Sequence, residues 1–332
     1  MEALKDRFGR THNYLRISVT DRCNLRCVYC MPEEGVAFTE ASHLLTYDQI
    51  AEVVEVGASL GITKLRITGG EPLVRPDLHK LIARLSGIPG IEDIALTTNG
   101  VFLAKQAQAL KEAGLTRVNI SLDTLDPTRF AFIARRGELR RVLEGIEAAA
   151  EAGFHPIKLN CVLLKNVNED EIAEFLRMAY EKPLHVRFIE YMPIGHADDN
   201  WRAHYLPLSR VLEIANERYT IARREDVRGN GPSEDWEIEG GVGSFGLIHP
   251  ISDHFCKSCN RLRLTADGSL KPCLYWMDEL NVKGALGDSA AMREIFAKAM
   301  DIKPENHEMA AKLADTALSH VPTERRMSQI GG

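Results

Sequence analysis

Six of the seven cysteines fall into two groups of three, and these groups are the residues best suited to do chemistry. Cys23, Cys27 and Cys30 have the spacing C-x3-C-x2-C. Three thiolates in one loop can hold three irons of a cubic four-iron cluster, which leaves the fourth iron free to bind a substrate. Structural zinc is the alternative, but it usually takes four ligands, and no histidine lies within this loop.

The second group, Cys256, Cys259 and Cys273, has the spacing C-x2-C-x13-C. A zinc ribbon completed by His249 or His254 is the alternative to a second iron–sulfur cluster, and the spacing alone does not choose between them. The remaining cysteine, Cys161, lies in the middle of a predicted strand, so we expect a buried packing residue there.

The elements that must position these cysteines alternate between short β-rich runs and longer amphipathic runs, which is typical of parallel βα units. The predicted strands are 13–19, 63–68, 91–97, 116–122, 155–164 and 184–191, and the predicted helices include 76–86, 101–113, 139–152 and 168–181. Six units are too few to close an eight-stranded barrel. The sequence therefore predicts an α/β fold, a partial (β/α)6 TIM-type barrel whose ligand face is at the C-terminal ends of the strands.

The alternation ends near residue 218, where a turn-forming sequence and a cysteine-bearing segment follow. We expect two domains, the barrel over residues 1–218 and a smaller C-terminal cluster-binding domain over residues 219–332. Gly241 to Gly246 matches the dinucleotide-binding glycine pattern, but Pro250 follows too soon for the helix that this pattern requires. We interpret these glycines as a turn.

The composition is that of an ordinary globular protein, with 332 residues, of which 45% are hydrophobic and 27% charged. A net charge of −6 argues against nucleic acid as a partner, and no apolar run is long enough to cross a membrane. The charged N-terminus lacks the apolar stretch of a signal peptide, so we expect a cytoplasmic protein. The oligomeric state is left open, with a homodimer among the options.

The first cysteine group, with Tyr29 directly before its last cysteine, resembles the radical S-adenosylmethionine (SAM) superfamily. Gly69-Gly70-Glu71-Pro72, at the end of a predicted strand, is similar to the glycine-rich segment that receives SAM in that superfamily. The resemblance implies an N-terminal [4Fe-4S] cluster whose open iron chelates SAM.

Four segments together resemble the GTP 3′,8-cyclase family of molybdenum cofactor biosynthesis over nearly the whole chain. They are Thr20 to Pro32, Arg66 to Leu73, Cys259 to Gly268, and the terminal Gly331-Gly332. This resemblance implies a second [4Fe-4S] cluster on the C-terminal cysteines. It also implies radical cyclisation of GTP to (8S)-3′,8-cyclo-7,8-dihydroguanosine 5′-triphosphate.

The same resemblance implies roles for individual residues and partners. SAM would be held by Tyr29, Gly70, Ser121 and Met192, and GTP by Arg16, Arg66, Thr97, Lys158, Arg261, Leu262 and Arg263. Residues implied to act in catalysis are Arg16, Arg261, Arg263, Gly331 and Gly332. The implied partners are an electron donor such as flavodoxin or ferredoxin, and cyclic pyranopterin monophosphate synthase, which would take the product.

Two other functions stay open at this point. A two-cluster radical SAM enzyme that modifies a peptide would share both cysteine groups, although Arg261 and Arg263, two apart on a strand, share one face and suit phosphates better. A non-catalytic metalloprotein would carry zinc on the second group.

The chain lacks a G-x4-G-K-[ST] loop, so GTP would be a substrate held by side chains. The acidic Glu234 and Asp235 depart from the family pattern and put local domain contacts in doubt.

Overall fold

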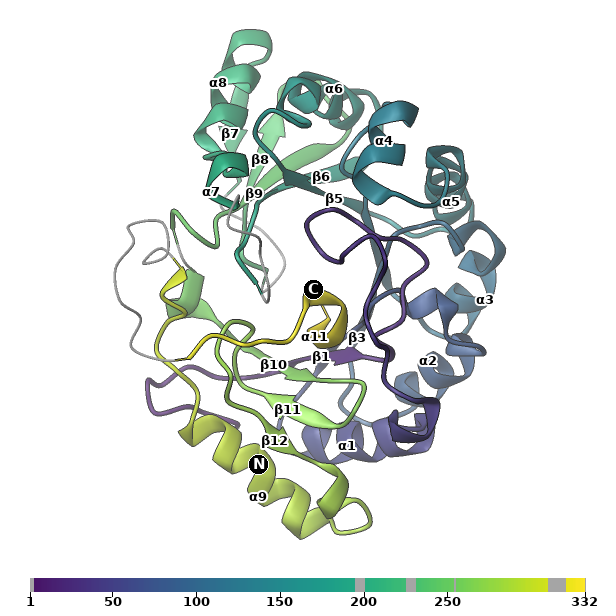
Figure 1. Ribbon diagram of the computed structural model, residues 1–332, viewed down its shortest axis with the longest axis vertical. Helices are drawn as coiled ribbons and strands as arrows, with labels where there is room; N and C mark the ends of the chain where they lie inside the picture. The colour runs from purple at the N-terminus through teal and green to yellow at the C-terminus, as the bar shows by residue number, and fades with distance from the viewer. Residues whose placement is uncertain (1–2, 195–200, 225–230, 254, 310–320, 332) are drawn as a thin grey trace.

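The structure, a computed structural model, describes residues 3–194, 201–224, 231–253, 255–309 and 321–331. Six parallel strands follow one another in space in chain order, as the sequence predicts. They are β1 (Tyr14–Ser18), β2 (Lys64–Thr68), β3 (Asp93–Thr98), β4 (Arg117–Ser121), β5 (Ile157–Leu163) and β6 (Leu184–Glu190). The prediction of a partial (β/α)6 barrel is confirmed, and Figure 1 shows the strands curving around a central space with helices outside.

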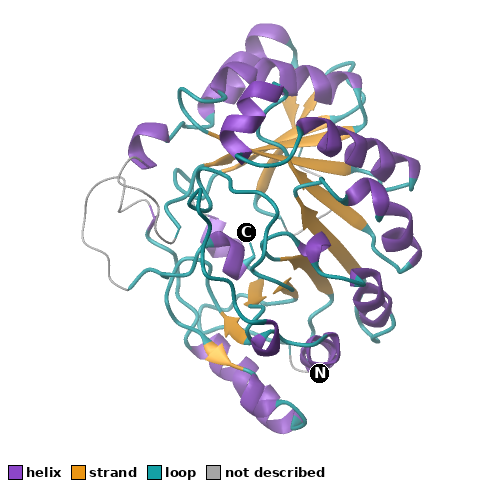
Figure 2. Ribbon diagram, turned by 45° about the vertical axis from the view of Figure 1, so that its right-hand side comes forward, coloured by secondary structure: helices purple, strands orange, loops and turns teal. Residues whose placement is uncertain are grey.

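Helices cover the outer face of this curved sheet, so the strands line the inside (Figure 2). Those of the barrel are α1 (Tyr47–Ser59), α2 (Leu78–Ser86), α3 (Ala107–Glu112), α4 (Pro127–Ala134), α5 (Leu139–Glu151) and α6 (Ile172–Glu181). Those that follow are α7 (Trp201–His204), α8 (Ser209–Arg218), α9 (Ser289–Asp301) and α11 (Met327–Ile330). Short 3-10 turns are Ala41–His43, Pro72–Val74, Leu103–Lys105, Glu169–Glu171, Phe255–Ser258 and Lys283–Ala285.

The segment after residue 218 extends both edges of the barrel sheet. Its strands are β7 (Ile221–Arg223), β8 (Ser233–Ile238), β9 (Ser244–Ile248), β10 (Arg261–Leu264), β11 (Ser269–Lys271) and β12 (Leu280–Asn281). Strand β9 pairs with β6 and β10 pairs with β1, both parallel, so one sheet of twelve described strands runs from β12 to β7. Of the glycine pattern at residues 241–246, residues 241–243 form the predicted turn, whereas residues 244–246 are the first residues of β9.

Apolar residues fill the layer between sheet and helices, and Cys161 is fully buried there, as predicted. A second apolar cluster joins the barrel to the C-terminal segment. It contains Leu164, Tyr191, Ile194, Trp201, Ile251, Tyr275, Trp276, Met309 and Ile330. Because its members come from both parts of the chain, the two parts share a core. None of the described helices is long and apolar enough to cross a membrane.

Candidate active site

The loop between β1 and α1 carries the first cysteine group, and Gly69 and Gly70 at the end of β2 pack directly against it. Gly70 N–H donates to Thr20 O at 2.7 Å. A Cβ on Gly70 would lie 2.4 Å from Arg22 O, and one on Gly69 would lie 2.4 Å from Thr20 O. Only glycine fits at this approach of two backbones, so both glycines help to shape the cysteine loop.

Glu71 was not predicted to act in the site. Its hydrogen bonds connect the end of β2, the end of β3 and the cysteine loop. Its carboxylate accepts hydrogen bonds from Thr98 Oγ1 and from Asn99 N–H, both at 2.7 Å. Asn99 in turn donates to Asn24 Oδ1 at 2.8 Å, inside the cysteine loop. Burial raises the pKa of Glu71 to about 7, although its hydrogen bonds oppose the shift. The ends of β2 and β3 therefore fix the loop that bears Cys23.

The thiol donors of both groups are of the type that iron–sulfur clusters use. No three His, Cys, Asp or Glu side chains in the described residues lie close enough to hold one metal ion. A zinc site places its donors about 2.0–2.3 Å from one point, whereas the cysteines of a four-iron cluster bind separate irons. Burial raises the pKa of Cys23 to about 12 and that of Cys30 to about 11. Thiolates at these positions therefore need a strong cation, such as cluster iron, beside them.

The zinc-ribbon alternative receives no support from the described residues. His249 Nδ1 lies 3.2 Å from Ser252 Oγ and 3.9 Å from Glu190 Oε1, and among the described residues this histidine belongs to no group of three side chains able to hold one metal ion. His254, the other candidate ligand, lies outside the described residues.

Tyr29 lies beside the cysteines in a buried hydrogen-bond network that orients its ring. Its hydroxyl donates to Asp123 Oδ2 at 2.6 Å, and Val162 N–H donates to Asp123 Oδ1 at 2.9 Å. Burial raises the pKa of Asp123 to about 6. Tyr29 and Met192 both pack against the second apolar cluster, so the structure brings these two predicted SAM ligands together.

The remaining predicted SAM ligands, Gly70 and Ser121, lie at the C-terminal ends of β2 and β4. They are thus on the edge of the sheet where a (β/α) barrel places its ligand site. Asp123 follows Ser121 by two residues, at a strand end that the sequence places on the ligand face, but its bond to Tyr29 was not predicted because the two residues lie far apart in the chain.

A wall of cations lines the inner face of the sheet. Arg263 on β10 is in register with Arg16 on β1, which is in register with Arg66 on β2. Side chains in register on neighbouring strands lie on the same face. Arg66 also donates to Thr97 Oγ1 at 3.4 Å, so a further predicted GTP ligand joins this set. Arg261 is two residues from Arg263 on the same strand, in register with Tyr14.

Lys158 on β5 continues the wall, together with Arg187 on β6, which sequence reasoning missed. Arg187 is level with Asn160, two residues beyond Lys158, and its Nη2 donates to Asn119 Oδ1 at 2.6 Å. No motif surrounds Arg187, since its position in the barrel depends on the pairing of β6. Strand β6 also contains His185 and Glu190, so the sequence gives Arg187 no distinctive signal.

Burial and mutual repulsion lower the pKa values of these cations. Burial and Arg263 hold the pKa of Arg16 well below its usual range. Burial, with Arg261, lowers the pKa of Arg263 to about 10. Burial and the charge of Arg66 lower the pKa of Arg187 to about 9. Burial and the charge of Arg187 lower the pKa of Lys158 to about 8. Gathering buried like charges is unfavourable unless an anion neutralises them, so the wall is suited to a polyanion.

Cations also surround the second cysteine group. Arg10 Nη1 donates to Cys256 O at 2.8 Å, and the buried Lys303 donates to Arg261 O at 2.9 Å. Burial would raise the pKa of Cys259, but Lys303 and Arg261 outweigh it and lower that pKa. Neither Arg10 nor Lys303 was predicted, because both lie far in sequence from the cysteines that they approach.

The C-terminal helix α11 brings the two sites together. Arg263 Nη1 donates to Ile330 O at 3.2 Å and also to Gly331 O. The backbone of Ser328 lowers the pKa of the Cys30 thiol, against the larger effect of burial. Figure 1 shows α11 in the middle of the ring of strands. Gly331 is therefore placed beside a predicted GTP ligand, while Gly332 lies outside the described residues.

Leu262 differs from its neighbours among the predicted GTP ligands. Its side chain is fully buried in the apolar core, on the face of β10 opposite the arginines. Only its backbone is available to a ligand.

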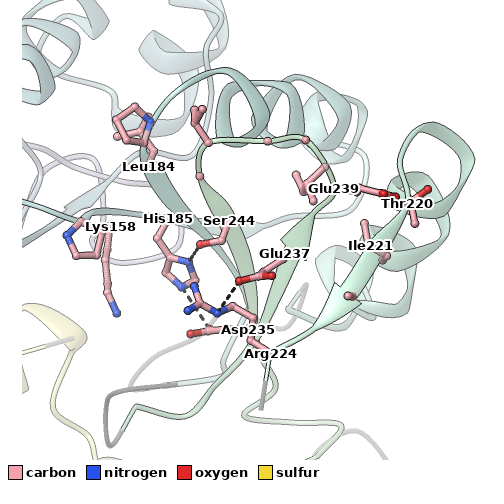
Figure 3. Close-up of a pocket in the computed structure, with 18 of the residues that line it drawn as sticks. Lys158, Leu184, His185, Thr220, Ile221, Arg224, Asp235, Glu237, Glu239 and Ser244 are labelled. Carbon is pink, nitrogen blue, oxygen red and sulfur yellow. Dashed lines mark hydrogen bonds and ion pairs between the residues drawn. The ribbon is translucent and has the colours of Figure 1, made fainter. Parts of the chain in front are cut away.

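A cavity of about 1100 Å³ lies at the N-terminal ends of β5, β6 and β9, at the opposite strand ends from the cysteine loop (Figure 3). His185 stands between Asp235 Oδ1, 3.2 Å from its Nε2, and Ser244 Oγ, 2.8 Å from its Nδ1. Asp235 also raises the pKa of Lys158 through its charge. Asp235 is thus a buried carboxylate whose charge acts on Lys158 and Arg187, at the β5–β6 end of the cation wall.

The fold and the paired cysteine sites define a radical SAM protein. The family model described as "Radical SAM superfamily" matches residues 17–179, and the one described as "Molybdenum Cofactor Synthesis C" matches residues 184–309. The chain belongs to the GTP 3′,8-cyclase family. It is 57% identical to the GTP 3′,8-cyclase of Listeria monocytogenes serovar 1/2a and 49% identical to that of Lactiplantibacillus plantarum, with all of both chains covered in each case.

Solved structures support the fold. The chain resembles Streptococcus suis SuiB bound to precursor peptide SuiA, with a TM-score of 0.62, 14% identity, and coverage of 93% of this chain and 68% of that one. It also resembles anSMEcpe with bound AdoMet, with a TM-score of 0.58, 14% identity, and coverage of 89% and 82%. At this identity the likeness extends to the fold alone.

Proposed function

We propose that this chain cyclises GTP to (8S)-3′,8-cyclo-7,8-dihydroguanosine 5′-triphosphate, the first step of molybdenum cofactor biosynthesis. The observation that carries the proposal is the wall of buried cations between the two cysteine groups. Lys158, Arg187 and Arg263 form no ion pair within 4.0 Å among the described residues. A triphosphate would supply the missing negative charge through charge-assisted hydrogen bonds.

The two cysteine groups would each hold a [4Fe-4S] cluster. When bound and reduced, the N-terminal cluster supplies the single electron that cleaves SAM. Tyr29, Gly70, Ser121 and Met192 would hold SAM beside Cys30, and the ring of Tyr29 is kept in place by Asp123. The chain itself would bind and orient SAM, and it would exclude water from the site.

GTP would lie between the cation wall and the second cysteine group. Its binding residues would be Arg16, Arg66, Thr97, Lys158, Arg261, the Leu262 backbone and Arg263, with Arg187 added by the structure. Gly331 and Gly332 would close the site, because residues without side chains can approach a ligand closely. Holding the ribose and the guanine in one orientation is what allows a bond between them to form.

The partners follow from this chemistry. Each turnover begins with one electron, so the chain needs a low-potential donor such as flavodoxin or ferredoxin. The cyclised nucleotide would pass to cyclic pyranopterin monophosphate synthase. A peptide-modifying role is disfavoured, since a peptide substrate would leave a wall of buried cations without counter-charge.

The test is product identification by mass spectrometry. The protein is reconstituted anaerobically with iron and sulfide, reduced with dithionite and incubated with SAM and GTP. We expect 5′-deoxyadenosine and the cyclised nucleotide together, and no cyclised nucleotide when SAM is omitted. Formation of 5′-deoxyadenosine without any modified GTP would contradict the proposal.

Variants of the first cysteine group provide the control. Cys27→Ser should abolish SAM cleavage, because a hydroxyl rarely replaces a thiolate on iron. The C-terminal cluster should remain, at about half the iron content of the unmodified protein. Retained 5′-deoxyadenosine formation would contradict the assignment of this loop to the SAM-cleaving cluster.

A further inference from the structure

A positively charged segment, residues 132–141, lies on the surface where α4 turns into α5. It contains four arginines and one glutamate, in a chain whose net charge is −6. Arg135, Arg136, Arg140 and Arg141 are all exposed. On the cysteine loop, Glu33 and Glu34 follow Met31 and are also exposed.

This segment is bonded to the loop that carries the first cysteine group. Val28 N–H donates to Ile133 O and Arg26 N–H donates to Ala134 O, both at 2.9 Å. Arg135 Nη1 donates to Met31 O at 3.1 Å. These contacts fall on both sides of Cys27 and Cys30, and Figure 1 shows the loop passing beside α4.

The turn at Gly137 keeps this contact tight. Its φ is +82°, and a Cβ there would lie 2.9 Å from Leu25 Cδ2, between Cys23 and Cys27 in the loop. Segment and loop are therefore packed without an intervening layer, which shortens the path from the surface to the cluster.

An apolar side chain stands in the positive surface. Phe132 is 61% exposed, which is unusual for so large a hydrophobic residue. Arg136 and Arg141 form no ion pair with a carboxylate in the part of the chain that the structure describes, whereas Arg140 pairs with Glu144 at 3.5 Å. An exposed aromatic residue and exposed arginines within one ten-residue segment have the composition of a protein interface.

We propose that Phe132, Arg135, Arg136 and Arg141 dock an acidic electron-carrier protein that reduces the N-terminal cluster. This inference rests on the proposed function, since only a redox cluster in the loop needs a donor. One electron leaves the carrier, which is oxidised, and enters the cluster, which is reduced; no atom is transferred. A small, charged interface suits such a partner, because electron-transfer complexes are brief and depend on electrostatic steering.

The test compares two reductants on one double variant, Arg136→Glu with Arg141→Glu. The rate of 5′-deoxyadenosine formation is measured with a reduced flavodoxin, an acidic protein, and with dithionite, which needs no docking surface. With flavodoxin at low ionic strength we expect the variant to be slower by about tenfold or more, which is the scale of electrostatic steering. With dithionite the two proteins should have the same rate.

Arg293→Glu with Lys298→Glu on α9 is the matched control, because it changes the net charge equally at the far end of the molecule (Figure 1). It should react with flavodoxin at nearly the unmodified rate. Phe132→Ala is a second variant that leaves the charge unchanged, and it should also slow the flavodoxin reaction alone. Added salt should slow the unmodified protein more than the Arg136/Arg141 variant.

Unchanged flavodoxin rates in both the charge-reversal variant and Phe132→Ala would overturn the proposal. Equal losses with flavodoxin and dithionite would also overturn it, because they would assign these residues to the structure of the cysteine loop. Failure of the proposed function is distinguishable from both results, since the unmodified protein would then not cleave SAM even with dithionite.

Discussion

Lys158 is the residue of the cationic wall whose charge responds most to pH. Burial and the nearby Arg187 lower its pKa from 10.5 to about 8. The amine is therefore charged below that pH and becomes neutral as the pH rises through it. We expect GTP to bind more weakly as the pH rises through about 8, because a neutral amine no longer attracts a phosphate. Calorimetric titration with GTP about one pH unit below and above this pKa measures the effect.

Lys158→Arg is the control for this pH dependence, because a guanidinium keeps its charge to higher pH than an amine in the same surroundings. Its GTP affinity should change little where that of the unmodified protein falls. If both proteins lose affinity in parallel, another group causes the change and the role given to Lys158 is wrong.

Arg263 is the wall residue that contacts both the sheet and the tail. Arg263→Ala and Arg261→Ala should each weaken GTP binding and leave SAM binding unchanged. Losing a buried charge-assisted contact typically costs about 2 to 5 kcal/mol, which is roughly 30-fold or more in affinity. Calorimetry with GTP and with SAM measures both. Unchanged GTP affinity in the two variants would mean that these arginines belong only to the sheet.

Residues of the site could be predicted where their partners are near in sequence. Cys23, Cys27 and Cys30 share one loop, so their spacing alone indicates a cluster. Arg187 and Lys303 carry no such signal, because each acquires its role from contacts with strands or loops far along the chain. A buried charge inside a strand or helix is recognised only when the fold supplies its neighbours.

Among the elements, the tail is held by a close fit at Gly331. Its φ is +70°, and a Cβ there would lie 2.3 Å from Thr68 Cγ2. Gly331→Ala should therefore displace the tail and withdraw the carbonyls that Arg263 contacts. We expect SAM cleavage to continue while cyclised product falls steeply. Measuring 5′-deoxyadenosine and cyclised nucleotide in the same reaction gives the amount of cyclised product formed per SAM cleaved.

Two further variants test whether the C-terminal tail acts in the site or is only a frayed chain end. Deletion of Gly331 and Gly332 should reproduce the loss of product with both clusters intact. Thr68→Ser combined with Gly331→Ala should restore part of it, since serine lacks the Cγ2 that a new Cβ would strike. Product at the unmodified rate from Gly331→Ala would show that the tail has no part in cyclisation.

The six barrel strands could be predicted because each is an apolar run bounded by turn residues, and the pattern is local. The short helix α4 was missed, since it begins at Pro127 in what reads as a loop after β4. Strand β10 was anticipated only through the Arg261 and Arg263 pair, and β11 and β12 were missed. These strands span three and two residues, so they carry no periodicity and exist through pairing with β10 and with one another.

At the scale of the whole molecule, the C-terminal segment completes the barrel sheet at both edges. Strand β10 covers β1 and strand β9 covers β6. The second apolar cluster is also built from both parts of the chain. The boundary at residue 218 stays a prediction, and the pairing suggests that residues 1–218 depend on residues 219–332 for their stability.

We therefore expect residues 1–218, produced alone, to aggregate or to unfold without a cooperative transition. Removing residues 219–332 would leave the edges of β1 and β6 unpaired, and an uncovered strand edge is a template for association with other chains. It would also expose apolar residues such as Leu164 and Tyr191, which are buried in the complete chain. Size-exclusion chromatography and thermal unfolding followed by circular dichroism compare the fragment with the full chain. Production of the two pieces together should recover a folded complex, because the missing edges are then supplied in trans. A monomeric fragment that unfolds cooperatively on its own would show that the six-stranded barrel is a self-sufficient domain and that the shared sheet is not needed for its stability.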